Sequence, residues 1–259
     1  MSSSQKIAMK ITVITVCRNS DATIATTMRS VAEQTYPSIE HIVVDGASID
    51  DTLSVVKKYK IEQGAVVSAS DSGMYDAMNK GLRLATGDIV GFINSDDFYS
   101  SPDALSKIAD SFTDPSVDAC YGDLDYVDRE RTSVIVRRWR SSKFSPGLFL
   151  RGWCPAHPTF YARKHVFDRY GGFDLQYMIA ADVELMARFM EVHRISTRYI
   201  PEVLVKMRMG GVTNRSWRNV IKQNREIWHA LSAHNLSPSL ISFVSNKILL
   251  RSKQFLLPA

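Results

Sequence analysis

Apolar runs of strand length alternate with segments of helical periodicity through the first third of the chain. The strand-like runs are rich in Val and Ile and occupy residues 10–17, 39–46, 65–70 and 88–93. Apolar positions at helical spacing fill the intervals, at residues 21–34, 52–59 and 74–85. Strands that alternate with helices form mostly parallel sheets with helices on both faces. The pattern therefore predicts an α/β fold.

Two of these helices have candidate caps. Asp21 precedes the apolar positions of the first helix, and Asp is a preferred N-cap residue. Ser48 and Asp51 stand before the second helix at the spacing of a capping box, with Asp in place of the usual Glu. We therefore expect the first helix to begin directly after Asp21, and Ser48 and Asp51 to cap the second.

The pattern changes after residue 115. Strand character returns at 117–127, at 132–140, which suits an antiparallel edge, and at 195–209. Residues 181–193 predict a helix with an apolar face formed by Val183, Met186, Phe189, Met190 and His193. The last fifty or so residues have a helical, amphipathic pattern that Pro238 interrupts. We expect three parts: residues 1–115, residues 116–207 and a helical tail over residues 208–259.

Composition places the chain among soluble globular proteins. It has 259 residues, of which 45% are hydrophobic and 23% charged. No apolar run approaches the length of a membrane span, and the first ten residues lack the apolar core of a signal peptide. Cys17, Cys120 and Cys154 are odd in number and far apart, which indicates reduced thiols. We expect a cytoplasmic protein.

The net charge of +5 is unevenly distributed. From Lys206 onward the chain carries nine basic residues against one acid, Glu226, whereas the preceding part is mildly acidic. A basic tail indicates an anionic partner, such as a membrane surface, a nucleic acid or another polyanion. The acidic body disfavours nucleic acid. An anionic membrane surface is therefore one candidate partner of the tail.

Acidic residues follow three of the predicted strands. They are Asp45, then Asp71 with Asp76, and then the adjacent pair Asp96 and Asp97. In open α/β sheets ligands bind beyond the carboxyl ends of the strands, so these loops are expected to converge on one rim. Adjacent acids repel each other, and a metal ion, a helix N-terminus or water would have to compensate their charge.

Two interpretations of Asp96 and Asp97 remain open from the residues alone. One is a solvated turn in which Asp97 caps the next segment. The other is a site for Mg²⁺ or Mn²⁺ that holds a substrate diphosphate, since these ions use one or two carboxylates and phosphate oxygens. A receiver domain is disfavoured because Cys17, Arg18 and Asn19 follow the first strand where acids would stand. The same turn has no glycine, which disfavours a Rossmann dehydrogenase.

Residues 11–52, from ITVITVCRNSD to DGASIDDT, and residues 71–99, DSGMYDAMNKGLRLATGDIVGFINSDDFY, resemble inverting glycosyltransferases of family 2. The resemblance extends over about residues 10–200 and is nearest to bacterial enzymes that build capsule, exopolysaccharide or O-antigen repeat units. It implies the GT-A fold, a nucleotide-sugar-binding half over 1–115 and an acceptor-binding half over 116–207. It also implies a Mg²⁺ or Mn²⁺ cofactor bound at a DxD motif.

The resemblance assigns roles to individual residues. Asp96 would be the metal-binding acid of the DxD motif, with Ser95 at its middle position. Asn94 stands where the family has the first Asp, and its amide oxygen can still coordinate a metal or bond the sugar. The remaining donor contacts would be Thr15, Val16 and Arg18 around the base, Asp45 bonded to the base, and Asp71, Asn79 and Lys80 along the nucleotide and sugar.

The resemblance places the catalytic base at Asp182. An inverting transfer needs a carboxylate that takes the proton of the attacking hydroxyl. The alternative for Asp182 is a simple N-cap, and Glu184 is the second candidate for the base. On the acceptor side, His157 would contact the diphosphate, the acceptor or the metal, or it would be structural. Trp153 would stack on a sugar, or pack in the core.

The tail admits two interpretations. Its apolar face would pack on the protein or on a second subunit, or it would lie on anionic lipid at the inner face of the plasma membrane. That face comprises Leu240, Phe243, Val244, Ile248 and Leu249. The second interpretation suits an acceptor that is a lipid-linked saccharide.

The sequence as a whole predicts transfer of a sugar from a nucleotide-diphosphate donor, with uridine favoured, to a hydroxyl of a glycan or lipid-linked oligosaccharide. One competing hypothesis is a non-catalytic nucleotide-sugar-binding relative, which Asn94 keeps open. The other is a nucleotidyltransferase. That class opens with a glycine-rich basic loop, which this chain lacks.

Overall fold

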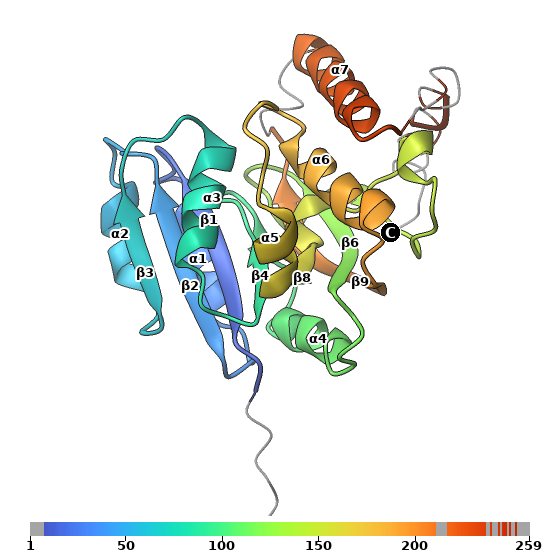
Figure 1. Cartoon of the computed structure of the whole chain (residues 1–259). Coiled ribbons are helices and arrows are strands. Elements are labelled where there is room, and N and C mark those ends of the chain that lie inside the picture. The colour runs from blue at the N-terminus through green and yellow to red at the C-terminus, as the bar shows by residue number, and fades with distance from the viewer. Residues whose placement is uncertain are drawn as a thin grey trace, which may run out of the picture.

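The structure is a computed structural model of the whole chain. It describes residues 8–210 and 217–236, and beyond these only residues 239, 243, 245–247, 249 and 252. Figure 1 shows a central sheet with helices on both faces and one further helix standing over one end.

The first half has the predicted alternation of strands and helices. The elements are β1 (Ile11–Cys17), α1 (Ile24–Ala32), β2 (Ile39–Asp45), α2 (Thr52–Tyr59), β3 (Gly64–Ser68), α3 (Met74–Leu84) and β4 (Ile89–Phe92). The strands pair in the order β3-β2-β1-β4, and all three pairings are parallel. The predicted α/β fold with a parallel sheet is therefore confirmed.

The second half extends the same sheet with mixed pairings. Its elements are β5 (Phe98–Tyr99), α4 (Ala104–Ser111), β6 (Ala119–Val127), β7 (Ile135–Trp139), η1 (Phe149–Arg151), η2 (His157–Thr159), β8 (Tyr161–Arg163), α5 (Lys164–Tyr170), α6 (Ala181–Ala187), η3 (Arg188–Val192), β9 (Thr197–Arg208) and α7 (Trp217–Ala233). The sheet continues from β4 through β8, β6 and β9 to β5. Of these pairings only β6 with β9 is parallel. As predicted, β7 is an antiparallel addition to β6.

The two faces of the sheet pack against different helices because successive strand residues point to opposite sides. Ile14 and Val16 of β1 join the core that contains α3 and α6, whereas Ile11 and Val13 join the core that contains α4. Helix α3 lies very close to β1: a side chain at Gly81 would come within 2.4 Å of Ile14. This close packing fixes where α3 presents its residues at the carboxyl edge of the sheet.

Both predicted helix caps are wrong. Helix α1 begins at Ile24, after the N-cap residue Thr23, and no side chain caps it. Helix α2 follows Asp51, again with no capping side chain. Ser48 instead donates its hydroxyl to the carboxylate of Asp45, three residues earlier, so a local hydrogen bond at the end of β2 takes the group that would have capped α2.

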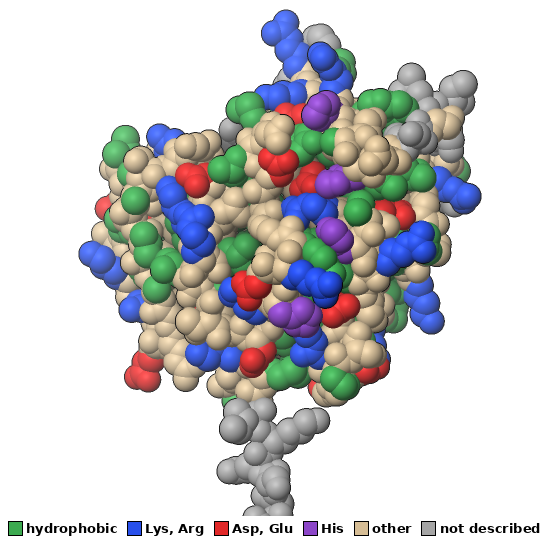
Figure 2. Space-filling model, in the orientation of Figure 1, with side chains coloured by type: hydrophobic (Ala, Val, Ile, Leu, Met, Phe, Trp, Pro, Cys, Tyr) green, Lys and Arg blue, Asp and Glu red, His purple; other side chains and the backbone are tan. Residues whose placement is uncertain are grey.

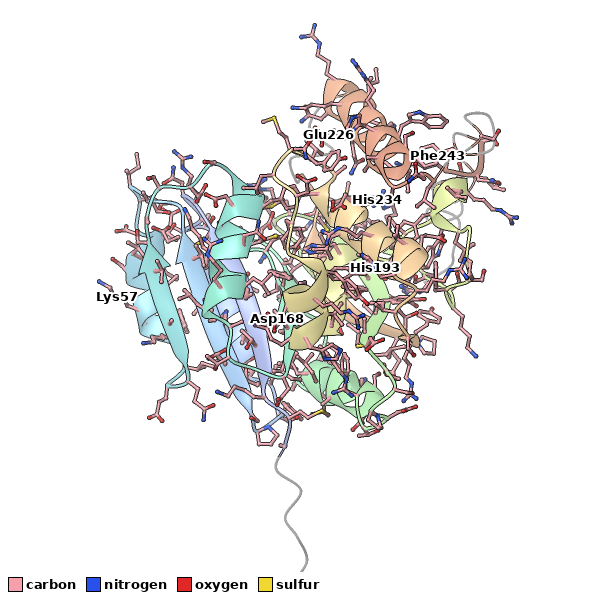
Figure 3. All side chains as sticks on the ribbon, in the orientation of Figure 1. Lys57, Asp168, His193, Glu226, His234 and Phe243 are labelled. Atoms are coloured by element: carbon pink, nitrogen blue, oxygen red, sulfur yellow. The ribbon has the colours of Figure 1, made fainter. Side chains whose placement is uncertain are left out.

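The predicted helix over 181–193 forms as α6 followed by the π-helical turn η3. Its apolar residues are buried as predicted, except that His193 is exposed and stacks on Tyr170 at a centroid distance of 3.9 Å. Figure 3 shows His193 beside the helices α5 and α6. All three cysteines are unpaired, as expected. No helix among the described residues is both long and apolar enough to cross a membrane.

The predicted three-part division is not marked by a break in the sheet. The first boundary, at residue 115, falls in the loop between α4 and β6, and the second falls at the last residue of β9. In the tail, helix α7 buries Ile227, Ala230 and Leu231 in the same core as α6. Phe243 is buried there as well, whereas Leu249 is exposed. Leu240, Val244 and Ile248 lie outside the described residues.

Candidate active site

The loops that follow the parallel strands meet at the predicted rim. The backbone N–H of Gly46 donates to the carbonyl of Cys17 at 2.8 Å, which ties the loop after β2 to the end of β1. A side chain at Gly46 would lie 2.6 Å from Oδ2 of Asp71 and 3.4 Å from Cβ of Arg18. A side chain here would displace the Asp71 carboxylate, so Arg18 and Asp71 lie close to this part of the backbone. The rim thus brings together Arg18, Gly46 and Asp71.

Asp45 ends β2 as a fully buried carboxylate with several partners. It accepts hydrogen bonds from the backbone N–H of Ser48 at 3.0 Å, from the Ser48 hydroxyl and from the Ser68 hydroxyl at 2.6 Å. Burial alone would raise the pKa of Asp45, but these hydrogen bonds outweigh it and hold the pKa below the ordinary value. Asp45 therefore stays ionised at the rim. Its contact with a base remains a prediction.

The residues Asn94 to Asp97, which follow β4, form hydrogen bonds with α1 and with the loop that precedes α1. The hydroxyl groups of Ser20 and Ser95 lie 2.9 Å apart, and the Thr27 hydroxyl donates to the backbone carbonyl of Asp97 at 2.6 Å. The side-chain amide of Asn94 donates to Oδ2 of Asp97 at 3.3 Å. The NSDD motif is thus a fixed turn at the edge of the site.

The paired acids differ sharply in exposure. Asp97 is fully buried, so a solvated turn is excluded for it, whereas Asp96 is partly exposed. Burial, and then the neighbouring Asp96, raise the pKa of Asp97 well above its ordinary value. Asp97 therefore lies behind the site, and Asp96 is the acid of the pair that a ligand can reach.

Arg208 supplies a positive charge to this pair that the sequence analysis did not foresee. From the end of β9 it donates to the backbone carbonyl of Asp96 at 2.7 Å and to the Thr26 hydroxyl at 3.2 Å. Its guanidinium lies 5.2 Å from the ring centroid of Phe98. Burial lowers the pKa of Arg208, and the charges of Asp96 and Asp97 oppose that shift. Part of the acidic charge is thus compensated by protein.

The residues at this turn could bind a divalent cation together with the phosphate groups of a ligand. Among the described side chains, Oδ1 of Asn94 is buried without a hydrogen-bond partner, and the Asp96 carboxylate is partly exposed, so the turn offers oxygen atoms of the kind that Mg²⁺ and Mn²⁺ prefer. No group of three or more His, Cys, Asp or Glu in the described part of the chain could hold a metal by itself. Phosphate oxygens would therefore have to complete the coordination of a cation at Asp96.

Asp182 lies at the start of α6 and is connected to the first half of the fold by Tyr75 of α3. The Tyr75 hydroxyl lies 3.1 Å from Oδ1 of Asp182 and 3.1 Å from the carbonyl of Ile179. Burial, and then the charge of Asp182, raise the pKa of Tyr75 well above its ordinary value. The hydroxyl therefore stays protonated and donates. Asp182 is not the N-cap, since Ala180 takes that position, and the simple capping interpretation is wrong.

Glu184 is excluded as the second candidate for the base. It is 2% exposed, and its carboxylate forms an ion pair with Arg188 at 2.8 Å. His234, which follows α7, contacts the same carboxylate at 2.7 Å. Both partners bind the Glu184 carboxylate between α6 and α7, so this carboxylate is not available to take a proton from a ligand at the rim.

His157 lies between the end of β4 and Asp182. Its ring stacks on Phe92 at a centroid distance of 5.7 Å and meets Phe173 edge-on at 5.6 Å. Burial lowers the pKa of His157, while the charge of Asp182 acts in the opposite direction. Its Nε2 is buried with no hydrogen-bond partner among the described residues. His157 is therefore a mostly neutral imidazole close to the candidate base.

Two further predicted residues, Asn79 and Lys80, have structural partners. Both side-chain atoms of Asn79 bond the backbone of Phe173, at 2.9 Å each, and so join α3 to the loop before α6. Lys80 donates to the carbonyl of Ser70 at 2.7 Å and pairs with Asp76 at 3.2 Å. Their contacts with the nucleotide and sugar remain predictions.

Trp153 follows the packing interpretation. It is 8% exposed and contacts the rings of Tyr121, Phe144 and Phe149 at centroid distances of 5.5–6.0 Å. A sugar stacks on an exposed ring face, and this ring is enclosed by other aromatic side chains. Thr15 and Val16 are also buried, within β1, and the Thr15 hydroxyl lies 2.9 Å from Nε2 of His41. The contacts that the structure describes for Trp153, Thr15 and Val16 are thus contacts within the protein. Their contacts with substrate stay predictions.

The fold and this rim define an α/β protein with a ligand site at the carboxyl edge of its parallel strands, of the GT-A class. A family model described as "Glycosyl transferase family 2" matches residues 12–171, and the chain belongs to that family. It is a glycosyltransferase, as the sequence predicted.

Curated relatives agree with this assignment. A PGL/p-HBAD biosynthesis glycosyltransferase of Mycobacterium bovis is 31% identical over 207 residues, which cover 76% of this chain and 76% of that protein. An uncharacterized glycosyltransferase of Mycobacterium tuberculosis is 33% identical over 185 residues, or 70% of this chain and 69% of the relative.

Solved structures confirm the GT-A fold. TarS 1–349 of S. aureus in complex with UDP has a TM-score of 0.66 at 20% identity, with 96% of this chain and 71% of that chain covered. The mannosyltransferase PcManGT from Pyrobaculum calidifontis, in complex with GDP-Man and Mn²⁺, has a TM-score of 0.66 at 22% identity. That alignment covers 97% of this chain and 70% of the other.

Proposed function

We propose that this glycosyltransferase moves a sugar from a nucleoside-diphosphate donor, with uridine favoured, to a hydroxyl of a glycan or lipid-linked saccharide, with inversion at the sugar. The single observation that carries the proposal is the bond from Tyr75 to Asp182. It fixes a carboxylate from the second half beside the rim that the first half builds. Bacterial surface polysaccharide synthesis at the inner face of the plasma membrane is the proposed setting.

The chemistry follows from the positions of the acids. Asp182 takes the proton of the acceptor hydroxyl as its oxygen bonds to C1 of the sugar. The bond from C1 to the diphosphate oxygen breaks, and the nucleoside diphosphate departs with the electron pair. Asp96 and the donor diphosphate would together hold Mg²⁺ or Mn²⁺, which when bound neutralises charge on the leaving group. Arg208 holds the backbone carbonyl of Asp96 in place.

The proposed donor site predicts a selective response to nucleotides. We expect one of UDP, GDP, TDP and CMP to raise the melting temperature by about 5–10 °C at roughly a hundred times its Kd, because it binds only the folded state. The measurement is a thermal-shift panel with and without Mn²⁺. A larger shift with Mn²⁺ would support the site at Asp96. No shift with any nucleotide would contradict the proposal.

The metal role of Asp96 makes a separate prediction. Asp96→Ala should lower the Mn²⁺-dependent part of the nucleotide affinity by at least about 10–100-fold, the cost that even an indirect metal partner typically has. Affinity without metal should change little. Asp110→Ala on α4 removes an exposed acid and serves as the matched control. If Asp96→Ala binds nucleotide with Mn²⁺ as tightly as the wild type does, the metal does not bind at Asp96.

A further inference from the structure

A cavity beside the candidate base has a strongly basic lining. It has a volume of about 640 Å³ and lies between α7 and the loop that leads into α6. Its lining includes Arg218, Lys222, Arg225 and His229 of α7, and one acid, Glu226. Figure 2 shows lysine and arginine side chains projecting at the end of the molecule where α7 lies. The size is that of an ordinary ligand pocket.

The single acid in this lining, Glu226, accepts hydrogen bonds from the protein backbone. Glu226 accepts hydrogen bonds from the N–H groups of Ile179 at 2.8 Å and Ala180 at 3.1 Å. Its distance to Lys222 is 3.9 Å, so that ion pair is loose. Glu226 therefore anchors α7 to the loop and leaves the field of the cavity positive. Figure 3 shows Glu226 on α7 above α6.

The same anchoring fixes the cavity relative to the base. Ile179 and Ala180 directly precede α6, and the carbonyl of Ile179 accepts the Tyr75 hydroxyl that also bonds Asp182. On the other side of the loop, the Tyr177 hydroxyl lies 3.1 Å from Nδ1 of His229. The loop of residues 176–180 thus has the cavity on one side and the base on the other. The lining includes no residue of the NSDD turn, so a ligand in this cavity would not occupy the proposed diphosphate position at Asp96.

Exposed apolar side chains accompany the basic ones. Leu175 and Met178 on the loop and Ile221 on α7 are between 51% and 70% exposed. Ile221 itself lines the cavity. A basic cavity beside apolar side chains matches an amphiphilic anion, with arginine and lysine at the phosphates and the apolar residues against a hydrocarbon chain.

We propose that this cavity binds the phosphate groups of the acceptor, and that the acceptor is a prenyl-type lipid diphosphate carrying the saccharide. The inference rests on the proposed function, since it names the acceptor class of that reaction. Arg225 and Lys222 would hold the phosphates while the hydroxyl of the attached saccharide reaches Asp182. Binding through the head group also explains why α7 is basic on the face that borders the cavity.

The test uses the full chain with two soluble probes, farnesyl diphosphate and inorganic diphosphate, followed by calorimetry. We expect farnesyl diphosphate to bind, and the Lys222→Gln/Arg225→Gln variant to bind it about tenfold or more weakly, since each hydrogen bond from a charged group contributes substantially. The matched control is Lys57→Gln/Lys60→Gln, which removes two exposed charges around the end of α2, far from α7. The control should bind as the wild type does.

The outcomes separate the inference from the function. Equal binding of farnesyl diphosphate by the α7 variant and the wild type would overturn the phosphate site. Equal binding of inorganic and farnesyl diphosphate, both weakened by the variant, would support the phosphate site and overturn the lipid source. Nucleotide binding with Mn²⁺ is measured on the same samples and should be unchanged in the variant. If the wild-type protein does not bind any nucleotide with Mn²⁺, that result contradicts the proposed function, whatever the cavity binds.

Discussion

Asp182→Asn is expected to lower the turnover rate of sugar transfer by about 10²–10⁴-fold, the usual contribution of a positioned general base. The amide keeps the shape of the carboxylate, and its oxygen can still accept the hydrogen bond of Tyr75. It cannot take a proton from the acceptor. Nucleotide affinity should therefore stay the same, since the change lies on the acceptor side of the reacting bond. The measurement is release of nucleoside diphosphate from the donor that the nucleotide panel selects.

A matched control is Asp168→Asn, which makes the same chemical change on α5. Asp168 has a side chain that is 59% exposed and pairs only with Lys164 among the contacts described for it. Its variant should transfer at the wild-type rate. Retained transfer by Asp182→Asn, with nucleotide binding intact, would remove Asp182 from the role of base. Loss of both transfer and nucleotide binding would point to a role in donor binding instead.

Tyr75→Phe examines how the base is positioned. The hydroxyl orients Asp182 and touches no reacting atom in the proposed chemistry, so its loss should lower turnover less than Asp182→Asn does. Donor KM, measured in the same assay of nucleoside diphosphate release, should be unchanged, because the Tyr75 ring would still pack on Phe173. This result would identify Tyr75 as a positioning residue, whereas turnover equal to that of the wild type would show that Asp182 does not depend on this hydrogen bond.

The architecture could be predicted because it depends on patterns that are local in sequence. Buried parallel strands need continuous apolar runs, and their helices need an apolar stripe, so residues 11–17 and 24–32 indicate their own conformations. The acids at strand ends could be placed together for the same reason, since parallel strands deliver their carboxyl ends to one edge. The closeness of Asp71 and Arg18 to Gly46, and the 2.9 Å separation of the Ser20 and Ser95 hydroxyls, agree with this convergence.

The partners of those acids could not be predicted because they come from distant segments. Arg208 is separated from Asp96 by 112 residues, and it reaches the NSDD turn only because β9 pairs with β5 at the edge of the sheet. Tyr75 and Asp182 are 107 residues apart. A sequence pattern of period two or 3.6 contains no information about such pairings. The failed cap of α2 has a different, local cause, since Ser48 donates its hydroxyl to Asp45, only three residues earlier in the chain.

The buried Asp97 and its neighbour Arg208 carry the other large expected effect. Asp97 is fully buried and Arg208 is 8% exposed. Charged groups that are removed from water need compensation from nearby charges and hydrogen bonds. Arg208 provides both, through its charge and through its bonds to the Asp96 carbonyl and the Thr26 hydroxyl. The turn that carries Asp96 therefore depends on a residue that does not contact substrate in the proposed mechanism.

Arg208→Met should lower the free energy of unfolding by about 3 kcal/mol, since it removes charge-assisted hydrogen bonds and leaves buried acceptors without a donor. Urea denaturation measures this effect. The matched control is Arg169→Met on α5. Arg169 also lies over an aromatic ring, 5.3 Å from the centroid of Tyr170, but it is exposed. That variant should lose little stability. An unchanged unfolding midpoint in Arg208→Met would show that Arg208 does not compensate the paired acids.

The pH dependence of stability distinguishes charge compensation from simple packing. The pKa of Asp97 is raised in the folded protein, so its favourable contribution is present below the ordinary carboxyl pKa and is lost as the pH rises through the raised value. Without Arg208 the pKa of Asp97 should rise further. Arg208→Met should therefore be more destabilised, relative to the wild type, at neutral pH than at mildly acid pH.

Adding Asp97→Asn removes the titrating group, so the double variant should lose that extra pH dependence and regain part of the lost stability. A destabilisation that is equal at both pH values, with no rescue by Asp97→Asn, would mean that Arg208 acts through packing alone.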